Sequence, residues 1–283
     1  MPAKRSKGSK AAKPRRTAAK PAARGKTVAR PTREEHAPRA AGPDIIVPPV
    51  RAPLPERVLF ASTNILFHAL QETLGASAQS AARFGLGRAL LLTRGYDKFA
   101  LMRGAIGAPA AAVVLEEAIA AGAREIIILG PAVAFSPNIA VGDLILPTES
   151  IIADGTSPYY VSARTGAKPD ATLRGVAAHL LERSGVSFRT GRVASVDAVY
   201  VRPTARLAAL RRARVLAIDM ELAALLSVSR YRGVRAAALL VVSSPASGIP
   251  TELGPDRPVF LNAVIRAATA LSAWPETAAG TRR

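Results

Sequence analysis

Short apolar runs alternate with longer stretches of helical composition along most of this chain. Glu125–Leu129 is an unbroken apolar run of the kind that forms a strand buried on both faces. Pro109–Ala121 has helical composition, with proline in the first turn, where its missing N–H costs nothing, and Gly122 follows as a stop signal. The same pattern predicts further strands at Val58–Ala61, Arg88–Thr93, Phe99–Met102, Asp143–Leu146, Ser150–Ile152, Arg192–Val196, Val215–Ile218 and Arg235–Ser243, and further helices at Ala171–Ser184, Thr204–Arg212, Glu221–Tyr231 and Phe260–Ala273.

The alternation of strands and helices predicts the fold class. We expect an α/β domain over residues 44–275, with three layers and a mixed, mostly parallel sheet flanked by helices. Ligands of such folds bind beyond the carboxyl ends of the strands. The loops after Met102, Leu129, Ile218 and Ser243 are therefore the predicted places for a site.

Composition narrows the chemistry that this domain can perform. The chain has no cysteine, which excludes disulfides, thiolate zinc sites and cysteine nucleophiles. His36, His68 and His179 lie far apart in sequence, so we expect no metal centre. The longest apolar stretches, Ala108–Ala123 and Ala236–Val242, are interrupted by glutamates or too short to span a bilayer, so no membrane partner is expected.

A basic segment precedes the domain. The formal net charge of the chain is +19, and residues 1–40 contribute 13 Lys/Arg and 2 acids, a net +11. Residues 1–43 repeat a loose Ala-Ala-Lys-Pro unit and contain Val28 as their one large apolar side chain after Met1, too little apolar surface to offset the entropy of ordering. We therefore predict a disordered tail there and a second short tail over residues 276–283.

Three interpretations of the basic tail remain open. It is a solvated segment without a specific partner, a nonspecific ligand of nucleic acid through its Lys and Arg side chains, or an organellar transit peptide. The lysine and proline content and the missing amphipathic face argue against a transit peptide. No apolar segment of a secretory signal follows the basic stretch, so a cytoplasmic protein is expected.

Four ordered stretches between Val58 and Ser244 resemble the nucleoside phosphorylase family, which includes purine nucleoside and uridine phosphorylases and nucleosidases. They are a glycine-rich turn running into a Leu-Glu-Glu helix, a strand and glycine turn followed by Val-Gly-Asp-Leu, an Asp-Gly-Thr-Ser segment, and a Met-Glu helix with the strand behind it. In this sequence they occupy Gly104–Glu117, Gly122–Thr148, Asp154–Tyr160 and Ala217–Ser244.

The resemblance implies a nucleoside site. It maps ribose contacts onto Met220 and Glu221, because a carboxylate accepts hydrogen bonds from sugar hydroxyls and methionine offers a soft apolar wall. The alternative is an exposed first-turn glutamate beside a core methionine. Tyr200 is placed to stack on a base or to lie in the core, and Ser244 to hydrogen-bond the base. Gly107 and Gly130 belong to the two glycine turns.

The resemblance also implies inorganic phosphate as a co-substrate, no other cofactor, and a homo-oligomer. Several positions depart from the family pattern. Ile128, Pro131, Ala110 and Ser244 stand where arginine, a hydroxyl, serine and the aspartate of purine-specific members are expected, and Ala61-Ser62-Thr63 replaces Gly-Asp-Pro. Arg94 and Arg103 lie nearby in sequence without matching a motif arginine. No residue is assigned a catalytic role from the sequence.

These observations support competing functions. The first is phosphorolytic cleavage of the N-glycosidic bond of a purine or pyrimidine nucleoside, with Glu221 on the sugar. The alternative is a catalytically impaired relative that binds a nucleoside or nucleotide, with a basic tail on nucleic acid. A nucleosidase that uses water is a third reading, and it would still require a proton donor near Ser244.

Overall fold

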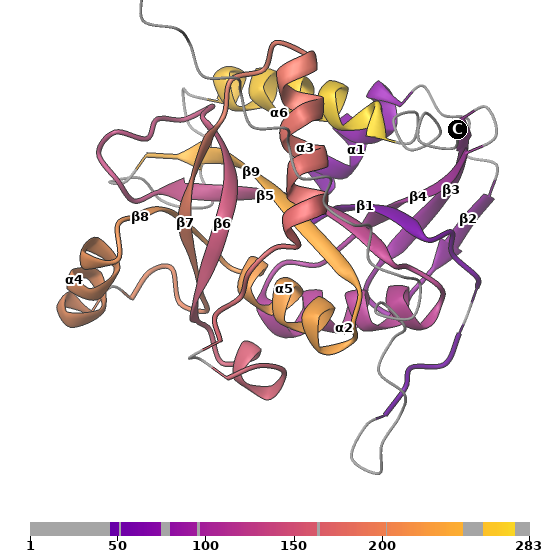
Figure 1. Ribbon diagram of the computed structural model, residues 1–283, viewed down its shortest axis with the longest axis horizontal. Coiled ribbons are helices and arrows are strands. Elements are labelled where there is room, and N and C mark those ends of the chain that lie inside the picture. The colour runs from indigo at the N-terminus through magenta and orange to yellow at the C-terminus, as the bar shows by residue number, and fades with distance from the viewer. Residues whose placement is uncertain are drawn as a thin grey trace, which may run out of the picture. The chain divides into compact units, whose positions relative to one another are not determined.

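The computed structural model describes residues 46–50, 52–74, 80–94, 97–162, 165–201, 203–245 and 257–274 (Figure 1). The chain divides into two units, Met1–Pro31 and Thr32–Arg283, and every described residue lies in the second. The predicted tails 1–43 and 276–283 fall outside the described residues, so their boundaries stay predictions. Within the described part, no helix is long and apolar enough to cross a membrane.

One mixed sheet runs through the described domain. Its strands lie in the order β2-β3-β4-β1-β5-β8-β7-β6-β9, and β9 also pairs with β5. The last five strands therefore form a closed circuit, while β2, β3 and β4 extend the sheet beyond β1. The bounds are β1 Arg57–Ala61, β2 Ser80–Arg83, β3 Arg88–Arg94, β4 Asp97–Arg103, β5 Glu125–Ala134, β6 Leu144–Ala153, β7 Arg189–Val196, β8 Val215–Asp219 and β9 Arg235–Ser244.

Helices cover both faces of this sheet, which confirms the predicted three-layer α/β class. Alternate residues of β5 point to opposite faces: Ile126 and Ile128 pack with α2 and α5, while Ile127 and Leu129 pack with α1, α3 and α6. Figure 1 shows the two helix layers on either side of the strands. The helices are α1 Asn64–Thr73, α2 Ala108–Ala120, α3 Ala171–Arg183, α5 Leu222–Tyr231 and α6 Arg257–Ser272.

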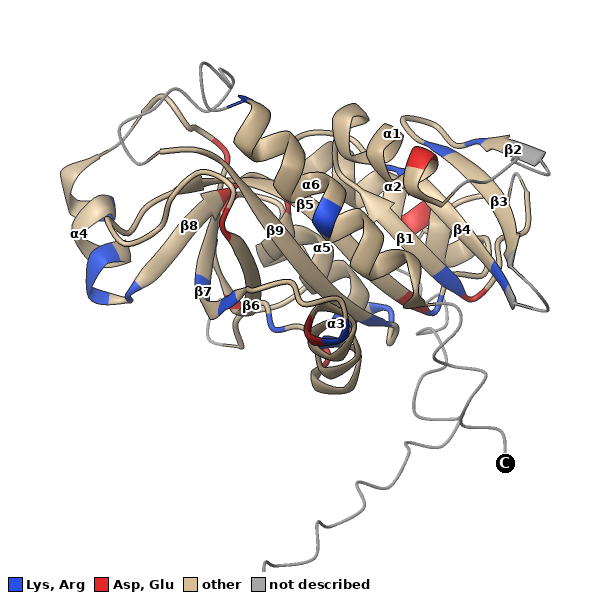
Figure 2. Cartoon of the chain, turned by 90° about the horizontal axis from the view of Figure 1, so that it is seen from above, with Lys and Arg blue, Asp and Glu red and all other residues tan. Residues whose placement is uncertain are grey.

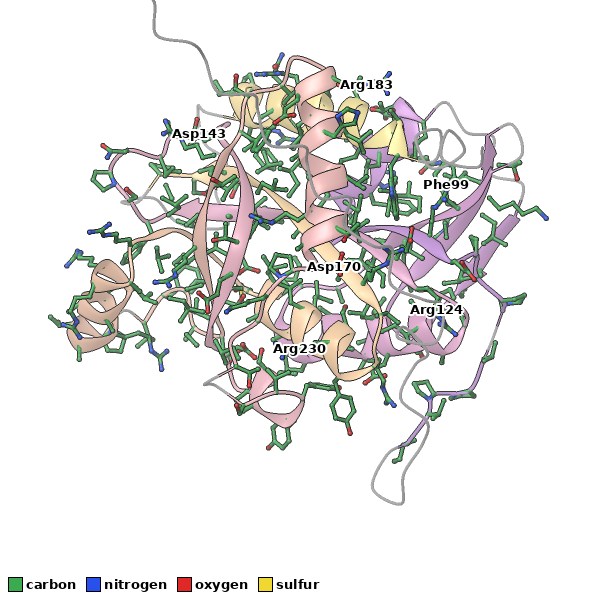
Figure 3. All side chains as sticks on the ribbon, viewed as in Figure 1. Phe99, Arg124, Asp143, Asp170, Arg183 and Arg230 are labelled. Carbon is green, nitrogen blue, oxygen red and sulfur yellow. The ribbon has the colours of Figure 1, made fainter. Side chains whose placement is uncertain are left out.

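Two further helical segments complete the described domain. The short 3-10 helix η2, Ser157–Tyr159, follows β6. Helix α4, Thr204–Arg212, buries only Leu210 and carries Arg211 and Arg212 in its last turn (Figure 2). Figure 3 shows Asp170 and Arg183 at opposite ends of α3. Asp170 is the N-cap of that helix and accepts a hydrogen bond from the Leu173 N–H at 2.7 Å.

Strand β5 continues where the sequence predicts a glycine turn. The predicted turn after Leu129 is wrong, because Gly130–Ala134 prolongs the strand beside β9. Strand β1 pairs only as far as Leu129, and β8 joins only at Val133. Pro131 therefore lies where β5 has a neighbour on one side, which is where a residue without an N–H is tolerated in a sheet.

Three other elements differ from the sequence prediction. Helix α1 and strand β2 were not predicted: α1 buries only Leu66, Phe67 and Leu70, and β2 is a four-residue strand defined by its pairing with β3. The two strands predicted around Pro147 are one strand, β6, whose register beside β7 shifts between Pro147 and Glu149. A local irregularity thus replaces the predicted break.

Candidate functional site

The junction between β8 and α5 places a carboxyl group in the interior of the domain. Glu221 is the N-cap residue of α5, and its side chain is 6% exposed. Its Oε1 accepts a hydrogen bond of 2.7 Å from the N–H of Gly107, the N-cap residue of α2. The two helix N-termini therefore meet at this carboxyl group, and the alternative of an exposed first-turn glutamate is wrong.

The electrostatics of Glu221 follow from its burial. Burial and the neighbouring charge of Asp219 raise the pKa of Glu221 from 4.5 to about 8, while the N–H groups of Gly107 and Met220 oppose this shift. Near neutral pH the group is thus close to its titration point. A buried carboxyl group with a strongly raised pKa is typical of a functional site.

The conformation of Gly107 suits this contact. Its φ of +92° is a backbone conformation that side chains rarely adopt, and a Cβ built there would have no atom within 4 Å. The space beside Gly107 is therefore open on the side away from the backbone. Met220, which precedes Glu221 in the chain, is half-buried and packs against the cluster of β7, β8 and α4, and its predicted contact with a sugar stays a prediction.

Two more aspartates shape the neighbouring turn. Asp154 accepts hydrogen bonds from the N–H groups of Thr156 and Ser157 at 2.8 and 2.7 Å and from the Ser157 hydroxyl at 2.7 Å. Asp197, at the end of β7, accepts a bond of 2.8 Å from the Gly155 N–H. Both carboxylates are committed to the backbone of the Asp154–Ser157 turn and hold it against the end of β7.

A cluster of unpartnered polar atoms lies beyond β1 and β4. Within the described part, the hydroxyls of Ser62 and Thr63 and the Nε of Arg103 are buried without a hydrogen-bond partner. An Nη of Arg103 donates to the Oδ1 of Asn64 at 3.2 Å. Buried polar atoms are nearly always paired, so donors left open in one place indicate a missing acceptor.

A short loop, Gly104–Gly107, connects this cluster to the Glu221 contact. The N–H of Gly104, which follows Arg103, donates to the Ala61 carbonyl at 2.8 Å, and the same loop reaches Gly107 three residues later. The α1 helix begins directly after Thr63, and its N-cap makes no side-chain cap bond. An arginine, two hydroxyls and a helix N-terminus together favour an anion.

Among the residues predicted from the sequence, the structure brings Glu221 and Gly107 together. Glu221 and Gly107 are joined by a hydrogen bond, Met220 is the neighbour of Glu221 in the chain, and a Cβ at Gly130 would lie 3.4 Å from the Ser62 hydroxyl. Ser244 is fully buried at the end of β9, and Tyr200 is 68% exposed, so the alternative of a core tyrosine is wrong. Base contacts from Tyr200 and Ser244 stay predictions.

The departures from the family pattern have clear structural places. Ile128 is 1% exposed and belongs to the core between the sheet and α2, so no charged group reaches the site from that position. Pro131 lies in β5, and Ala110 in the first turn of α2. Sequence reasoning treated Ser62 and Thr63 only as losses and did not identify Ser195 or Asp219.

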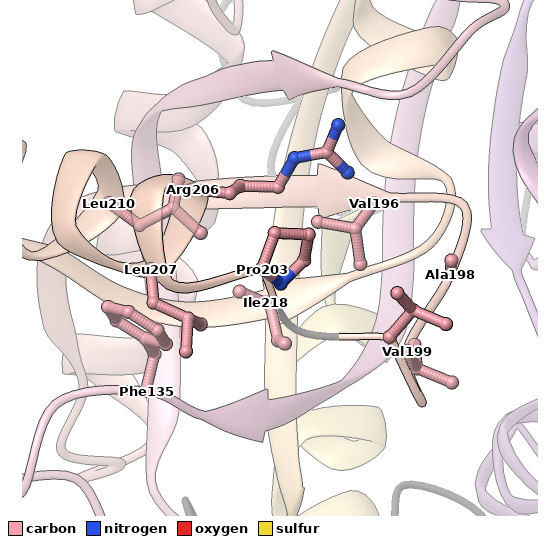
Figure 4. A pocket seen from close by; sticks show the side chains of 10 residues that line it. Phe135, Val196, Ala198, Val199, Pro203, Arg206, Leu207, Leu210 and Ile218 are labelled. Atoms are coloured by element: carbon pink, nitrogen blue, oxygen red, sulfur yellow. The ribbon is translucent and has the colours of Figure 1, made fainter.

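A small, mostly apolar cavity lies beside α4. It is lined by side chains of the β7 and β8 ends and of α4, among them Val199, Leu207 and Ile218 (Figure 4). Its volume of about 20 Å³ holds roughly one water molecule and no nucleobase. We therefore assign it to imperfect packing of α4. Among the described residues, no group of three or more His, Asp or Glu side chains has a metal-binding arrangement.

Comparisons with known proteins agree with this architecture. Residues 55–273 match the phosphorylase superfamily. The uridine phosphorylase of Thermococcus kodakarensis is 32% identical over 162 residues, which is 53% of this chain and 58% of the relative. The guanosine phosphorylase of Halorubrum lacusprofundi is 30% identical over 137 residues, 48% of this chain and 57% of the relative. The chain thus spans less than two thirds of these relatives.

Solved structures share the fold. The uridine phosphorylase of Vibrio fischeri superposes with a TM-score of 0.68 at 22% identity, covering 78% of this chain and 92% of the other. The Campylobacter jejuni 5'-methylthioadenosine/S-adenosyl homocysteine nucleosidase gives 0.66 at 19% identity, covering 78% and 99%. The three-layer α/β fold defines the class, and because the family match covers most of the chain, the chain belongs to the phosphorylase superfamily. The predicted nucleoside phosphorylase relationship is confirmed.

Proposed function

We propose that this protein cleaves the N-glycosidic bond of a nucleoside by phosphorolysis. One observation carries the proposal: the unpartnered polar atoms of Ser62, Thr63 and Arg103 lie at the ends of the paired strands β1 and β4, and the loop after Arg103 brings Gly107 to Glu221. An anion subsite next to a sugar-binding carboxylate is the arrangement that attack of phosphate on a ribosyl carbon requires. The relatedness to uridine and guanosine phosphorylases supports the same reaction.

In the proposed reaction, Glu221 in its ionised form accepts hydrogen bonds from the ribose hydroxyls, and Met220 packs against the sugar. Arg103 and the two hydroxyls hold inorganic phosphate by charge-assisted hydrogen bonds. A phosphate oxygen forms a bond to C1′ as the C1′–N bond breaks, and the bonding pair and a proton leave with the base. The products are ribose 1-phosphate and the free base. Orientation and charge stabilisation are the protein's contribution.

The test compares Arg103→Met with Arg183→Met. Arg183 is an exposed cation in the last turn of α3, and it belongs to none of the elements that form the site (Figure 3). Release of free base from uridine, guanosine, inosine and adenosine is followed with and without phosphate. We expect phosphate-dependent release, and a rise of roughly 10- to 100-fold in the KM for phosphate in Arg103→Met only, because a charged hydrogen bond contributes about 1.5–3 kcal/mol. Equal KM values for phosphate in the two variants would contradict the proposed anion subsite.

The second candidate is a binding protein that has lost turnover. Its support is that Ser244 is fully buried and Ile128 lies in the core, so neither supplies the aspartate or arginine chemistry of the family pattern. Nucleoside-induced thermal stabilisation without base release would establish this candidate. Release that does not depend on phosphate would instead identify a hydrolase.

We also infer that residues 1–43 bind nucleic acid nonspecifically in the cytoplasm. Their charge supports this inference, as do Arg206, Arg211 and Arg212 on α4, a helix that carries no acidic residue. Retention of DNA by the full chain and by a Δ1–43 variant is compared across salt concentrations. We expect retention that falls steeply with salt and is largely lost in the variant. Equal retention would rule out the tail.

A homo-oligomer is the remaining partner proposal. Ile106, two residues before α2, and Val113, within α2, are exposed apolar side chains, and so is Leu86, which follows the Gly85 whose N–H donates to Glu117 of that helix. Apolar side chains gathered in this way are typical of a protein interface. Light scattering measures the mass of the particle in solution for Val113→Glu and for the control Val259→Glu, which changes a similarly exposed valine of α6. We expect only the α2 substitution to reduce the mass of the oligomer.

A further inference from the structure

At the start of α5, the side chain of the N-cap residue does not cap the helix. The first N–H groups of any helix lack intrahelical acceptors, and the N-cap side chain normally supplies one. The N-cap residue of α5 is Glu221, and its side chain makes no such bond. Its carboxyl group instead reaches across to the N–H of Gly107 on another helix.

Asp219 and Ser195 cap the helix in place of Glu221. The Oδ2 of Asp219 accepts hydrogen bonds from the N–H groups of Glu221 and Leu222 at 2.9 and 2.6 Å. The Oγ of Ser195, on β7, accepts from the N–H of Ala223 at 2.7 Å and donates to the Oδ1 of Asp219 at 2.6 Å. Three consecutive N–H groups are thereby satisfied from outside the helix.

Burial makes this network rigid. Ser195 is fully buried and Asp219 is 6% exposed, so water does not compete for their hydrogen bonds. Ser150 extends the network, with its Oγ 3.1 Å from that of Ser195. The first turn of α5 is thus fixed to β7 and β8, and the side chain of Glu221 projects from a fixed point.

We propose that Asp219 and Ser195 are positioning residues that release the Glu221 carboxylate for the sugar by capping α5 in its place. The proposal rests on the proposed function for the identity of the ligand. The positioning role itself rests on the geometry, because the same two side chains hold the backbone from which Glu221 projects.

Charge gives Asp219 a second effect on Glu221. Asp219 accepts three hydrogen bonds, from Ser195, Glu221 and Leu222, which favour its ionised form, although burial raises its pKa overall. Its negative charge raises the pKa of Glu221. The charged group that faces Asp219 from the turn after β6 is Asp154, which also raises the pKa of Asp219. Loss of the Asp219 charge therefore lowers the pKa of Glu221.

Asp219→Asn tests this effect and retains a capping acceptor. The Asn carbonyl replaces Oδ2, and the Ser195 hydroxyl turns to Ser150 to accommodate the amide N–H. Asp170→Asn is the matched control, because Asp170 also caps a helix by accepting a backbone N–H, on α3. The pH dependence of kcat/KM and the carboxyl ¹³C shift of Glu221 are recorded for both variants.

We expect the inflection of both curves to move to lower pH by about one unit or more in Asp219→Asn, as the Coulomb interaction of two close carboxylates requires. In Asp170→Asn it stays in place. The ¹³C titration needs no turnover, so it decides the proposal even if no nucleoside is cleaved. A Glu221 titration that is the same in both variants would overturn it.

A second pair of variants isolates the capping contribution. Ser195→Ala removes the acceptor of the Ala223 N–H, whereas Ser227→Ala removes an equally buried hydroxyl of α5 that has no hydrogen-bond partner among the described atoms. We expect the nucleoside KM, or the Kd by calorimetry if turnover is absent, to rise roughly tenfold in Ser195→Ala only. Equal values in both variants would contradict the positioning role.

Discussion

At the residue scale, the carboxyl of Glu221 couples the site to pH. The ordinary pKa of a glutamate is 4.5, so its carboxyl group is ionised at neutral pH. Burial and the adjacent Asp219 raise the pKa of Glu221 to about 8. The hydrogen bonds that it accepts from backbone N–H groups offset only part of the free-energy cost of desolvation. Ligand binding that needs the ionised carboxylate should therefore strengthen as the pH rises through 8.

The same pKa predicts a stability difference for Glu221→Gln. The folded pKa lies above the ordinary 4.5, so the stability that this group contributes is complete below pH 4.5 and is lost as the pH rises through 8. Glutamine cannot ionise and escapes this loss. We expect the Tm values of the two proteins to agree at pH 5, and the variant to melt roughly 5 °C higher at pH 9. A Tm difference that is independent of pH would contradict the assignment.

Glycines 107 and 175 predict opposite effects of one substitution. Both have open space where a Cβ would stand, but Gly107 has φ +92° and Gly175 lies inside α3. Gly107→Ala should cost about 1–3 kcal/mol through backbone strain, and Gly175→Ala should stabilise by about 0.5–1 kcal/mol through helix propensity. Urea denaturation measures both, and effects of equal sign would show that the backbone at Gly107 is not restrained.

At the element scale, a buried ion pair joins α2 and α5, the helices that carry Gly107 and Glu221. Arg232 donates from Nε to Glu116 at 2.7 Å, and both side chains are largely buried. The Arg232 guanidinium also lies 5.6 Å from the ring centroid of Tyr231, and Tyr160 bonds to Glu116. Helix α2 is thus tied to α5 beyond the site as well as within it.

Removing one partner of this ion pair should lower the free energy of unfolding more than replacing both partners with apolar residues. We expect Arg232→Met to destabilise by about 3–5 kcal/mol, because it leaves Glu116 buried without its cation. The double variant with Glu116→Leu should recover most of that loss. Free energies of unfolding from a double-mutant cycle check this, and additive losses would show that the two side chains act independently.

At the scale of the whole molecule, anion binding should appear as folding stability. A ligand of the native state raises the free energy of unfolding by RT ln(1 + [L]/Kd). At ten times Kd, inorganic phosphate would add about 1.4 kcal/mol, or roughly 3–5 °C in Tm for a domain of this size. We expect this rise in the unmodified protein and not in Arg103→Met. Sodium chloride at matched ionic strength is the control, and an equal rise with chloride would indicate screening alone.

The sequence alone determined what depends on local pattern. Alternating apolar runs such as Glu125–Leu129 predicted the strands and the α/β class, because a strand buried on both faces must be apolar throughout. The order of the family segments predicted Glu221 and Gly107 for one site, and the two residues are hydrogen-bonded. These features follow from residues close together in the chain or from a motif that preserves their spacing.

The tertiary structure decided what depends on residues distant in sequence. In the sequence, Ser62 and Thr63 are departures from the family pattern and Arg103 matches no motif arginine. The pairing of β1 with β4 places these three residues at the same edge of the sheet, where polar atoms of each lack a hydrogen-bond partner. Ser195 caps a helix that begins 27 residues later, by accepting a hydrogen bond from the Ala223 N–H. Strand β5 passes its predicted turn because β9 supplies partners there. Pairing across the sheet, which no local pattern encodes, fixed each of these features.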